Sequence, residues 1–326
     1  MRVELKDEPV PFLITPEFVE RVWGFADLRP WIDREPDGRT IGEVWLSGDD
    51  CVAASGPWAG RRIGDLFQQY PRELLGNATA EAASPLLIKL IFAREKLSVQ
   101  VHPDDAMARK YGAARGKTEC WAVLQAEPDA TVAVGLRAGI TIADVERGIR
   151  EKTLEQMLEI VPVSKGELIY VDAGTIHAIL PGSALLEVQQ NCDVTYRLYD
   201  YGRPRELHVE KGLEALRLRT EAGKVAPHAL QDRTVLIEKQ YFRIERMTVD
   251  GARSQMQLEC GMSGRLNYIY VAKGTGSLQP KGAESIALSA QSMVLAPARS
   301  GDYSLQSEEP LEIYRIIDMA HGGGGD

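Results

Sequence analysis

Short runs of strand-forming residues recur along the chain, and this recurrence limits the possible folds more than any other feature. The runs are rich in Val, Ile, Leu and aromatic residues, and Gly, Pro and Asp separate them. Closely spaced short strands with turn residues between them are typical of antiparallel sandwiches and barrels. The sequence therefore predicts a mainly β protein, with strands at 43–47, 87–92, 97–102, 118–124, 131–136, 168–172, 185–190, 194–199, 235–249, 267–273, 293–296 and 311–317.

A few segments have a helical pattern and are expected to form local helices among the strands: about 104–113, 141–160 and 206–218. The second opens with Thr141 and has Asp144 three residues later, which is the spacing of a helix-capping pair. Apolar residues then recur at helical intervals. The predicted helices are too few to alternate with the strands, so the pattern disfavours a βαβ fold.

A polar segment at 219–233 separates two strand-rich regions. With 326 residues, the chain is long enough for two domains with separate cores. We expect a larger domain over 1–222 that carries the candidate site, a smaller β domain over 234–320, and a flexible tail at 321–326. Residues 268–279 have a strand–turn–strand pattern typical of a jelly roll.

Charge and hydropathy exclude several classes of partner. The formal net charge is −9 and the pI is near 5.3, whereas nucleic-acid binding needs a basic face. The chain has neither a signal-peptide pattern nor an apolar run of about 18 residues, so we expect a cytoplasmic protein with no membrane partner. The cysteines lie far apart without a CxxC pair and are predicted to be reduced thiols: Cys51, Cys120, Cys192 and Cys260.

Polar side chains interrupt one predicted strand in the stretch VQVHPDD, residues 99–105. Gln100 and His102 are two residues apart, so on a strand their side chains point to the same face. Glu119 begins a second strand, and His177 follows a turn in an apolar run. Residues of separate strands converge inside a β-barrel, where these four would offer two imidazole nitrogens, one carboxylate and one amide oxygen. Zinc accepts such ligands, and a single ligand charge leaves the ion a strong Lewis acid.

Spacing alone leaves a structural alternative open for each of these residues. A histidine in an apolar strand is more often a hydrogen-bonded interior group than a ligand, and a lone Glu119 is more often solvated. The other histidines lie in helix-like, linker and tail contexts and are expected to be structural or solvated: His208, His228 and His321.

A family resemblance narrows these alternatives. Several segments, in the same order, resemble the type I phosphomannose isomerase family in its short bacterial form. The resemblance is strongest over roughly 20–216 and continues more weakly to the C-terminus. The segments are RVWG (21–24), GEVWLSG (42–48), SVQVHPDD (98–105), GKTECW (116–121), GTIHAI (174–179) and EVQQNCDVTYRLYDYGRPRELHVEKGLEAL (187–216).

The resemblance implies a pair of cupin-type jelly-roll β-barrels and one Zn²⁺ per chain. It also implies interconversion of mannose 6-phosphate and fructose 6-phosphate through an enediol(ate). The implied metal ligands are Gln100, His102, Glu119 and His177. The implied catalytic residues are Arg197, Glu187 and Lys117. The implied substrate-binding residues are Ser98, Lys117, Arg197, Arg203 and Asp193.

The identity of the proton-transfer base stays open at this point. A carboxylate near a cation is a base at neutral pH, which favours Glu187. Arginine resists deprotonation, so Arg197 better suits the phosphate or the developing negative charge. We expect a small phosphorylated sugar as the ligand and a monomer or weak homodimer as the assembly.

Other classes of protein share part of this pattern. An iron cupin dioxygenase uses similar His and Glu ligands but leaves Ser98, Lys117 and Arg197 without a role. A non-catalytic sugar-binding or regulatory cupin is more attractive when a ligand is missing, and here all four are present. The region after 234 shows no comparable ligand set, so we expect it to be structural or interfacial.

Overall fold

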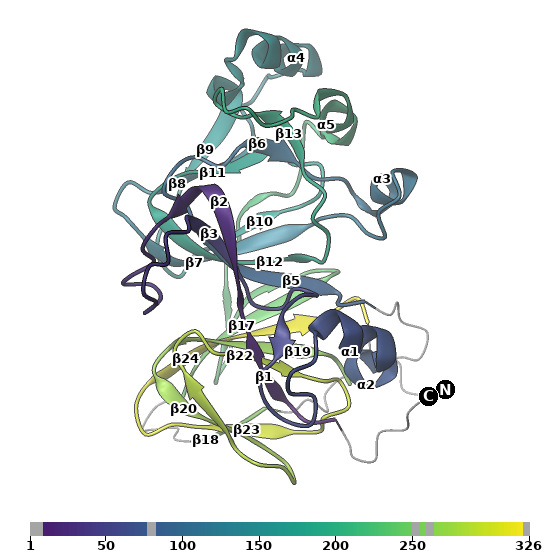
Figure 1. Cartoon of the computed structure of the whole chain (residues 1–326). Helices are drawn as coiled ribbons and strands as arrows, with labels where there is room; N and C mark the ends of the chain where they lie inside the picture. Colours follow the sequence, from purple (N-terminus) through teal and green to yellow (C-terminus); the bar gives the residue numbers. More distant parts are fainter. Residues whose placement is uncertain (1–8, 77–82, 250–254, 259–263, 322–326) are drawn as a thin grey trace. The chain divides into compact units, whose positions relative to one another are not determined.

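The computed structural model describes residues 9–76, 83–249, 255–258 and 264–321, and Figure 1 shows its elements along the chain. The chain divides into two compact units. The first comprises the described parts of Met1–Glu17, Leu46–Pro85 and Ala226–Asp326, and the second comprises Phe18–Trp45 and Leu86–Val225. The predicted domains, 1–222 and 234–320, are consecutive, whereas these units interleave along the chain.

The second unit contains two antiparallel sheets. The larger has seven strands and the smaller has five. In spatial order the larger sheet contains β14 (Gly223–Lys224), β10 (Leu168–Val171), β7 (Glu119–Ala126), β12 (Ser183–Gln190), β5 (Leu86–Phe92), β3 (Ile41–Trp45) and β2 (Glu17–Phe25). The smaller contains β13 (Tyr196–Tyr199), β6 (Val99–Val101), β11 (His177–Ile179), β8 (Thr131–Leu136) and β9 (Leu158–Pro162).

The two sheets of this unit enclose an apolar core. Trp121, Val123 and Leu185 of the larger sheet pack together with Val132 and Ile179 of the smaller. Successive strand residues point to opposite faces, so this core fixes which residues of each strand point between the sheets. In β7 the inward set is that of Trp121 and Val123, and in β11 it is that of Ile179.

The outer face of the smaller sheet is covered by helices. A second core contains Val99 and Val101 of β6 together with Val145 of α4 (Ile142–Glu151) and Ala215 of α5 (Val209–Ala215). Figure 1 shows α4 and α5 beside β6, β9 and β13. Because Val99 and Val101 face the helices, Gln100 between them faces the interior of the sandwich, and His102 continues the same alternation.

The predicted helices form, but all three are shorter than expected. α3 (Asp105–Lys110) lies within 104–113, and α5 lies within 206–218. Thr141 and Asp144 form the predicted capping box of α4. The expected helix over 141–160 is wrong beyond Glu151, because Lys152 adopts a left-handed conformation with φ 59°. A short 3₁₀ turn, η1 (Leu154–Met157), follows, and 158–160 belong to β9, which pairs with β8.

The first unit has an eight-stranded and a four-stranded sheet. The eight strands are β15 (His228–Ala229), β16 (Thr234–Glu238), β17 (Phe242–Val249), β24 (Leu311–Asp318), β19 (Asn267–Lys273), β22 (Met293–Ala296), β1 (Phe12–Thr15) and β4 (Val52–Ala53). The four are β18 (Gln255–Leu258), β23 (Tyr303–Gln306), β20 (Thr275–Pro280) and β21 (Ile286–Ser289). The core of this unit includes Val249, Ile269, Leu278, Leu305 and Ile313.

Several elements of the first unit have no strong local signal. β1 joins this unit by pairing with β22, which lies far away in the sequence. The short helices α1 (Ile63–Gln69) and α2 (Pro71–Leu75) lack a side-chain N-cap, and the start of α2 is marked only by Pro71 at its first position and by Glu73 in its first turn. The predicted run 235–249 is a hairpin of β16 and β17.

The expected mainly β architecture, with two-sheet jelly-roll units and a few local helices, is confirmed. The described helices are all too short or too polar to cross a membrane. Cys51, Cys120 and Cys192 are buried, while Cys260 lies outside the described residues. Of the predicted tail, 322–326 also lie outside them, and His321 lies 2.9 Å from Asp318 through its Nδ1.

Candidate metal centre and substrate cavity

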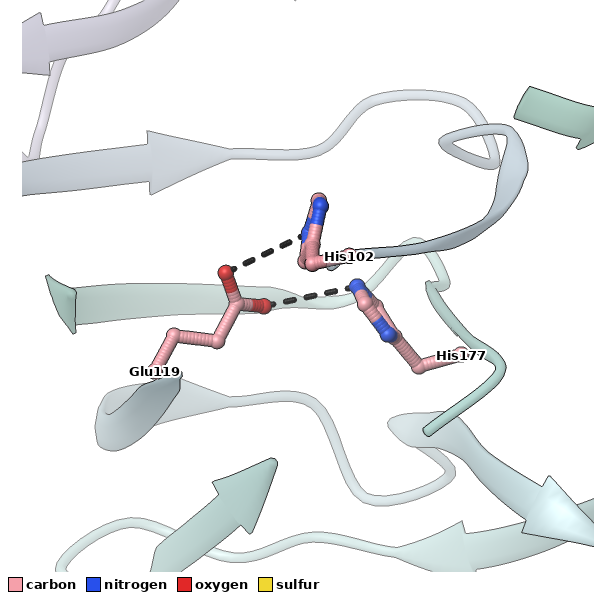
Figure 2. Close-up of side chains that lie close together, drawn as sticks. All are labelled: His102, Glu119 and His177. Carbon is pink, nitrogen blue, oxygen red and sulfur yellow. Dashed lines mark ion pairs between the residues drawn. The ribbon is translucent and has the colours of Figure 1, made fainter. Parts of the chain in front are cut away.

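Three candidate ligands from three strands meet between the sheets of the second unit. His102 follows β6, His177 begins β11, and Glu119 begins β7 in the opposite sheet. Nε2 of His102 lies 3.5 Å from Oε2 of Glu119, and Nε2 of His177 lies 3.4 Å from Oε1. Figure 2 shows the carboxylate facing both rings, with one oxygen toward His102 and the other toward His177. All three side chains are buried, and their potential ligand atoms lie within 4.8 Å of one another.

Both imidazoles are held with Nε2 free to act as a ligand. Nδ1 of His102 lies 3.0 Å from the carbonyl oxygen of Val194, and Nδ1 of His177 lies 2.9 Å from that of Thr175. A carbonyl only accepts hydrogen bonds, so each Nδ1 carries the proton and each Nε2 keeps its lone pair. Burial, and then the cation of Lys117, lower the pKa of His102 well below its usual value and that of His177 to about 4. Both rings are therefore neutral at pH 7.

The Glu119 carboxylate provides the strongest test of fit to a metal. Neither oxygen makes a hydrogen bond within the described parts of the chain, although both are buried. Lys117 lies close, with Nζ 3.0 Å from Oε2 of Glu119 and 3.2 Å from Nε2 of His102. A buried carboxylate without hydrogen bonds is costly. A divalent cation among these ligand atoms would satisfy both the carboxylate and the two imidazole lone pairs.

Gln100 lies next to the three buried ligands. It is the strand partner of His177, and its Nε2 lies 3.2 Å from Nε2 of that histidine. Its Oε1 lies 3.4 Å from Oγ of Ser98. The two ends of an amide are assigned from their hydrogen bonds, and half a turn about the last torsion would bring the oxygen to the histidine. Gln100 is therefore placed where a fourth ligand would be needed.

A cavity of about 380 Å³ adjoins this centre. Gln100 and Lys117 line it and also contact the metal-centre histidines. Four further predicted site residues line the same cavity: Ser98, Glu187, Asp193 and Arg197. Among the predicted catalytic and substrate-binding residues, Arg203 is the exception, because it is not among the lining residues. Its guanidinium donates to the carbonyl of Lys96 at 2.7 Å and pairs with Asp200 at 3.0 Å.

Four charged residues that line the cavity were missed from the sequence: Arg21, Glu43, Lys89 and Arg205. Lys89 had a usable signal, since it stands alone in the apolar strand LLIKLIF, every residue of which is buried. A lysine in such a strand needs a buried anionic partner. Arg205 donates to both oxygens of the buried Asp200, at 2.7 and 2.6 Å.

The cavity suits an anion although the protein as a whole is acidic. Five cationic and three anionic side chains line it, in a chain whose net charge is −9. Burial, and then the neighbouring cation Arg205, lower the pKa of the Arg197 guanidinium. An anionic group bound beside Arg197 would relieve this repulsion.

Glu187 is the carboxylate best placed to exchange a proton with a ligand in the cavity. Its Oε2 accepts a hydrogen bond from Nε1 of Trp121 at 3.1 Å, and its Oε1 lies 3.0 Å from Nζ of Lys89. Burial, and then the charge of Glu119, raise its pKa, while Lys89 and Lys117 oppose the rise. A carboxylate with a raised pKa that remains paired with a cation suits a general base.

The fold and the site together define a double jelly-roll protein with a buried His–Glu–His centre beside a cationic cavity. Residues 14–154 match the family model described as phosphomannose isomerase type I, catalytic domain. Mannose-6-phosphate isomerase ManA of Bacillus subtilis (strain 168) is 35% identical over 262 residues, which are 76% of this chain and 82% of that protein. The mannose-6-phosphate isomerase of Streptococcus mutans is 32% identical over 260 residues, or 76% of this chain and 81% of that protein. The chain belongs to the type I phosphomannose isomerase family.

Solved structures agree with this assignment. The crystal structure of mannose 6-phosphate isomerase from Bacillus subtilis superposes with a TM-score of 0.84 at 26% identity, and covers 94% of this chain and 99% of that one. A zinc-bound mannose 6-phosphate isomerase shares the fold, with a TM-score of 0.74 at 14% identity, and covers 95% and 100% of the two chains. The likeness therefore extends over both compact units, including the regions outside the matched catalytic domain.

Proposed function

We propose that this protein is a mannose-6-phosphate isomerase that interconverts mannose 6-phosphate and fructose 6-phosphate through an enediol(ate). The observation that carries the proposal is the buried Glu119 carboxylate, which accepts no hydrogen bond in the described parts of the chain and faces two neutral histidines and Lys117 beside a cationic cavity. The named relatives support the same activity. The ligand class is a small phosphorylated sugar. The proposed location is the cytoplasm and the proposed assembly a monomer or weak homodimer, without nucleic-acid or membrane partners.

One Zn²⁺ is the proposed cofactor, held by Gln100, His102, Glu119 and His177. When bound, it supplies a Lewis acid that polarises the sugar oxygens and stabilises negative charge on them. The backbone carbonyls that accept from the two Nδ1 groups fix the ring orientations. Such outer partners commonly change metal affinity or activity by about 10–100-fold.

Binding of the phosphate and of the sugar is assigned to residues near or in the cavity. Arg197 and Ser98 are proposed to bind the phosphate, with Arg205 adding a second guanidinium and Asp193 contacting a sugar hydroxyl. Arg203 was expected to bind phosphate directly, but its contacts suit it to support Asp200, which holds Arg205.

Proton transfer between C1 and C2 is assigned to Glu187. Its carboxylate removes the proton from one carbon and returns it to the neighbouring carbon, as a general base and then a general acid, while the hydroxyl proton passes between O1 and O2. Lys117, whose Nζ lies beside the metal ligands, is proposed to donate a hydrogen bond to an enediolate oxygen. Arg197 stays protonated throughout, because a guanidinium does not lose its proton at neutral pH.

The competing functions make different predictions. An iron dioxygenase would consume oxygen, and this function would leave the five cationic residues of the cavity without a role. A regulatory cupin would bind the sugar phosphate without turnover. The named relatives support neither.

The test is a chelation and re-addition assay of mannose 6-phosphate conversion. We expect chelation to abolish activity, and Zn²⁺ to restore it in the wild type but not in His177→Ala. His228→Ala is the matched control, since His228 lies exposed in the other unit. Activity that survives both the chelator and His177→Ala would remove the metal-dependent function.

A further inference from the structure

Four charged side chains of alternating sign lie on four consecutive strands of the larger sheet in the second unit. They are Glu187 on β12, Lys89 on β5, Glu43 on β3 and Arg21 on β2, which are consecutive strands of that sheet. Lys89 stands directly opposite Glu187 in the strand register. All four side chains line the cavity.

The contacts make one continuous series. Nζ of Lys89 lies 3.0 Å from Oε1 of Glu187 and 3.8 Å from Oε2 of Glu43. Glu43 in turn accepts from Arg21 at both oxygens, at 3.0 and 2.9 Å. Nε1 of Trp45 donates to the same Oε2 at 2.8 Å. Glu43 is thus tied on one side to a partly exposed arginine and faces a buried lysine on the other.

Burying these charged side chains costs free energy of folding, so such a series is expected only where the charges serve a function. Lys89, Glu43 and Glu187 are each at most 6% exposed. Well-packed apolar residues are often as stabilising as a buried ion pair, so stability alone gives little reason for a series of them. Burial alone would raise the pKa of Glu43, but Lys89 and Arg21 outweigh it and lower that pKa to about 2. The Glu43 charge is therefore permanent at physiological pH.

A permanent charge at Glu43 constrains Lys89. The lysine side chain has several rotatable bonds and one strong partner, Glu187, which is also the proposed base. Without a second anion, the ammonium could follow Glu187 or turn toward the cavity, where a bound phosphorylated sugar brings its own negative charge. When Glu43 is present, the ammonium of Lys89 is held between the carboxylates of Glu43 and Glu187.

We propose that Glu43 is a positioning residue of the active site, which acts through Lys89 to fix the orientation of Glu187. The inference rests on the proposed isomerase function, because the role of Glu187 does. Arg21 completes the arrangement by holding both oxygens of Glu43. Glu43 itself takes no part in proton transfer.

The kinetic test compares substitutions at Glu43 with a matched buried glutamate. Glu43→Gln removes the charge and keeps the volume, and we expect kcat to fall by about tenfold or more, with KM changed less than about threefold. Glu43→Asp restores the charge and should recover at least part of that loss. Glu245→Gln is the control, because Glu245 is 1% exposed and pairs with Arg233, Arg243 and Arg315 in the other unit.

A crystal structure of Glu43→Gln beside the wild type gives a second measurement that needs no turnover. We expect Nζ of Lys89 to leave its position between the two carboxylates. Unchanged kcat, or an equal loss in Glu245→Gln, would overturn the inference. If the wild type does not isomerise mannose 6-phosphate, the proposed function fails, and the position of Lys89 still decides the claim: a displaced ammonium supports the positioning contact and an unmoved one refutes it.

Discussion

The buried lysine on β5 allows a prediction whose magnitude follows from the structure. Lys89→Met keeps the length and apolar stem of the side chain but leaves Glu43 and Glu187 without their shared cation. At the observed distances of 3.0 and 3.8 Å, and with an effective dielectric constant of about 20, the two attractions are about 5.5 and about 4.4 kcal/mol. The cost of burying the ammonium opposes them. Removing one partner from a buried ion pair therefore lowers the free energy of unfolding by about 3–5 kcal/mol.

The loss of stability should depend on pH, with a defined sign. Glu187 has a raised pKa in the folded protein, chiefly through burial, and the loss of Lys89 raises it further. Between its unfolded and folded pKa values, the folded state then binds more protons than the unfolded state, so stability falls as pH rises. The deficit of Lys89→Met relative to wild type should be larger near pH 8 than near pH 5, because a larger fraction of Glu187 is protonated at lower pH and a protonated carboxyl needs no cation.

Urea unfolding of both proteins at these two pH values measures the difference. Lys273→Met is the control, because Lys273 is exposed and its removal should change stability by less than about 0.5 kcal/mol. A deficit below about 1 kcal/mol, or one that grows on acidification, would refute the reasoning from the Lys89 ion pairs.

Two further predictions concern the approach to the metal and the phosphate. A Cβ at Gly116 would lie 2.6 Å from the carbonyl oxygen of Pro103 and 2.5 Å from the backbone carbon of Asp104. Gly116→Ala should therefore displace Lys117, and the protein should bind less zinc by elemental analysis; full zinc content would contradict this. Arg205 lines the cavity and Arg203 does not, so Arg205→Ala should raise KM for mannose 6-phosphate by about tenfold in steady-state assays, and Arg203→Ala by less. The reverse order would place the phosphate on Arg203.

Local chemistry in the sequence accounts for much of the site. The alternation in VQVHPDD was enough to place Gln100 and His102 on one strand face, because a strand has a period of two wherever it lies. The capping pair of α4 was equally predictable, since Thr141 and Asp144 interact within one turn. Glu119 and His177 were candidate partners from their own strand contexts, the family resemblance favoured them as ligands, and the structure brings those two and His102 together.

The tertiary structure decided what depends on pairing between distant segments. In the sequence, Lys89 stands out only as a charged residue in an apolar strand. Its ion-pair partners, Glu43 and Glu187, lie on β3 and β12, far away along the chain. Likewise, no local signal separates Arg205 from Arg203, because which guanidinium faces the cavity depends on how Asp200 and the backbone of Lys96 are placed. The period and capping of an element are fixed by neighbours a few residues away, whereas the partner of a buried charge is fixed only once the sheets have assembled around it.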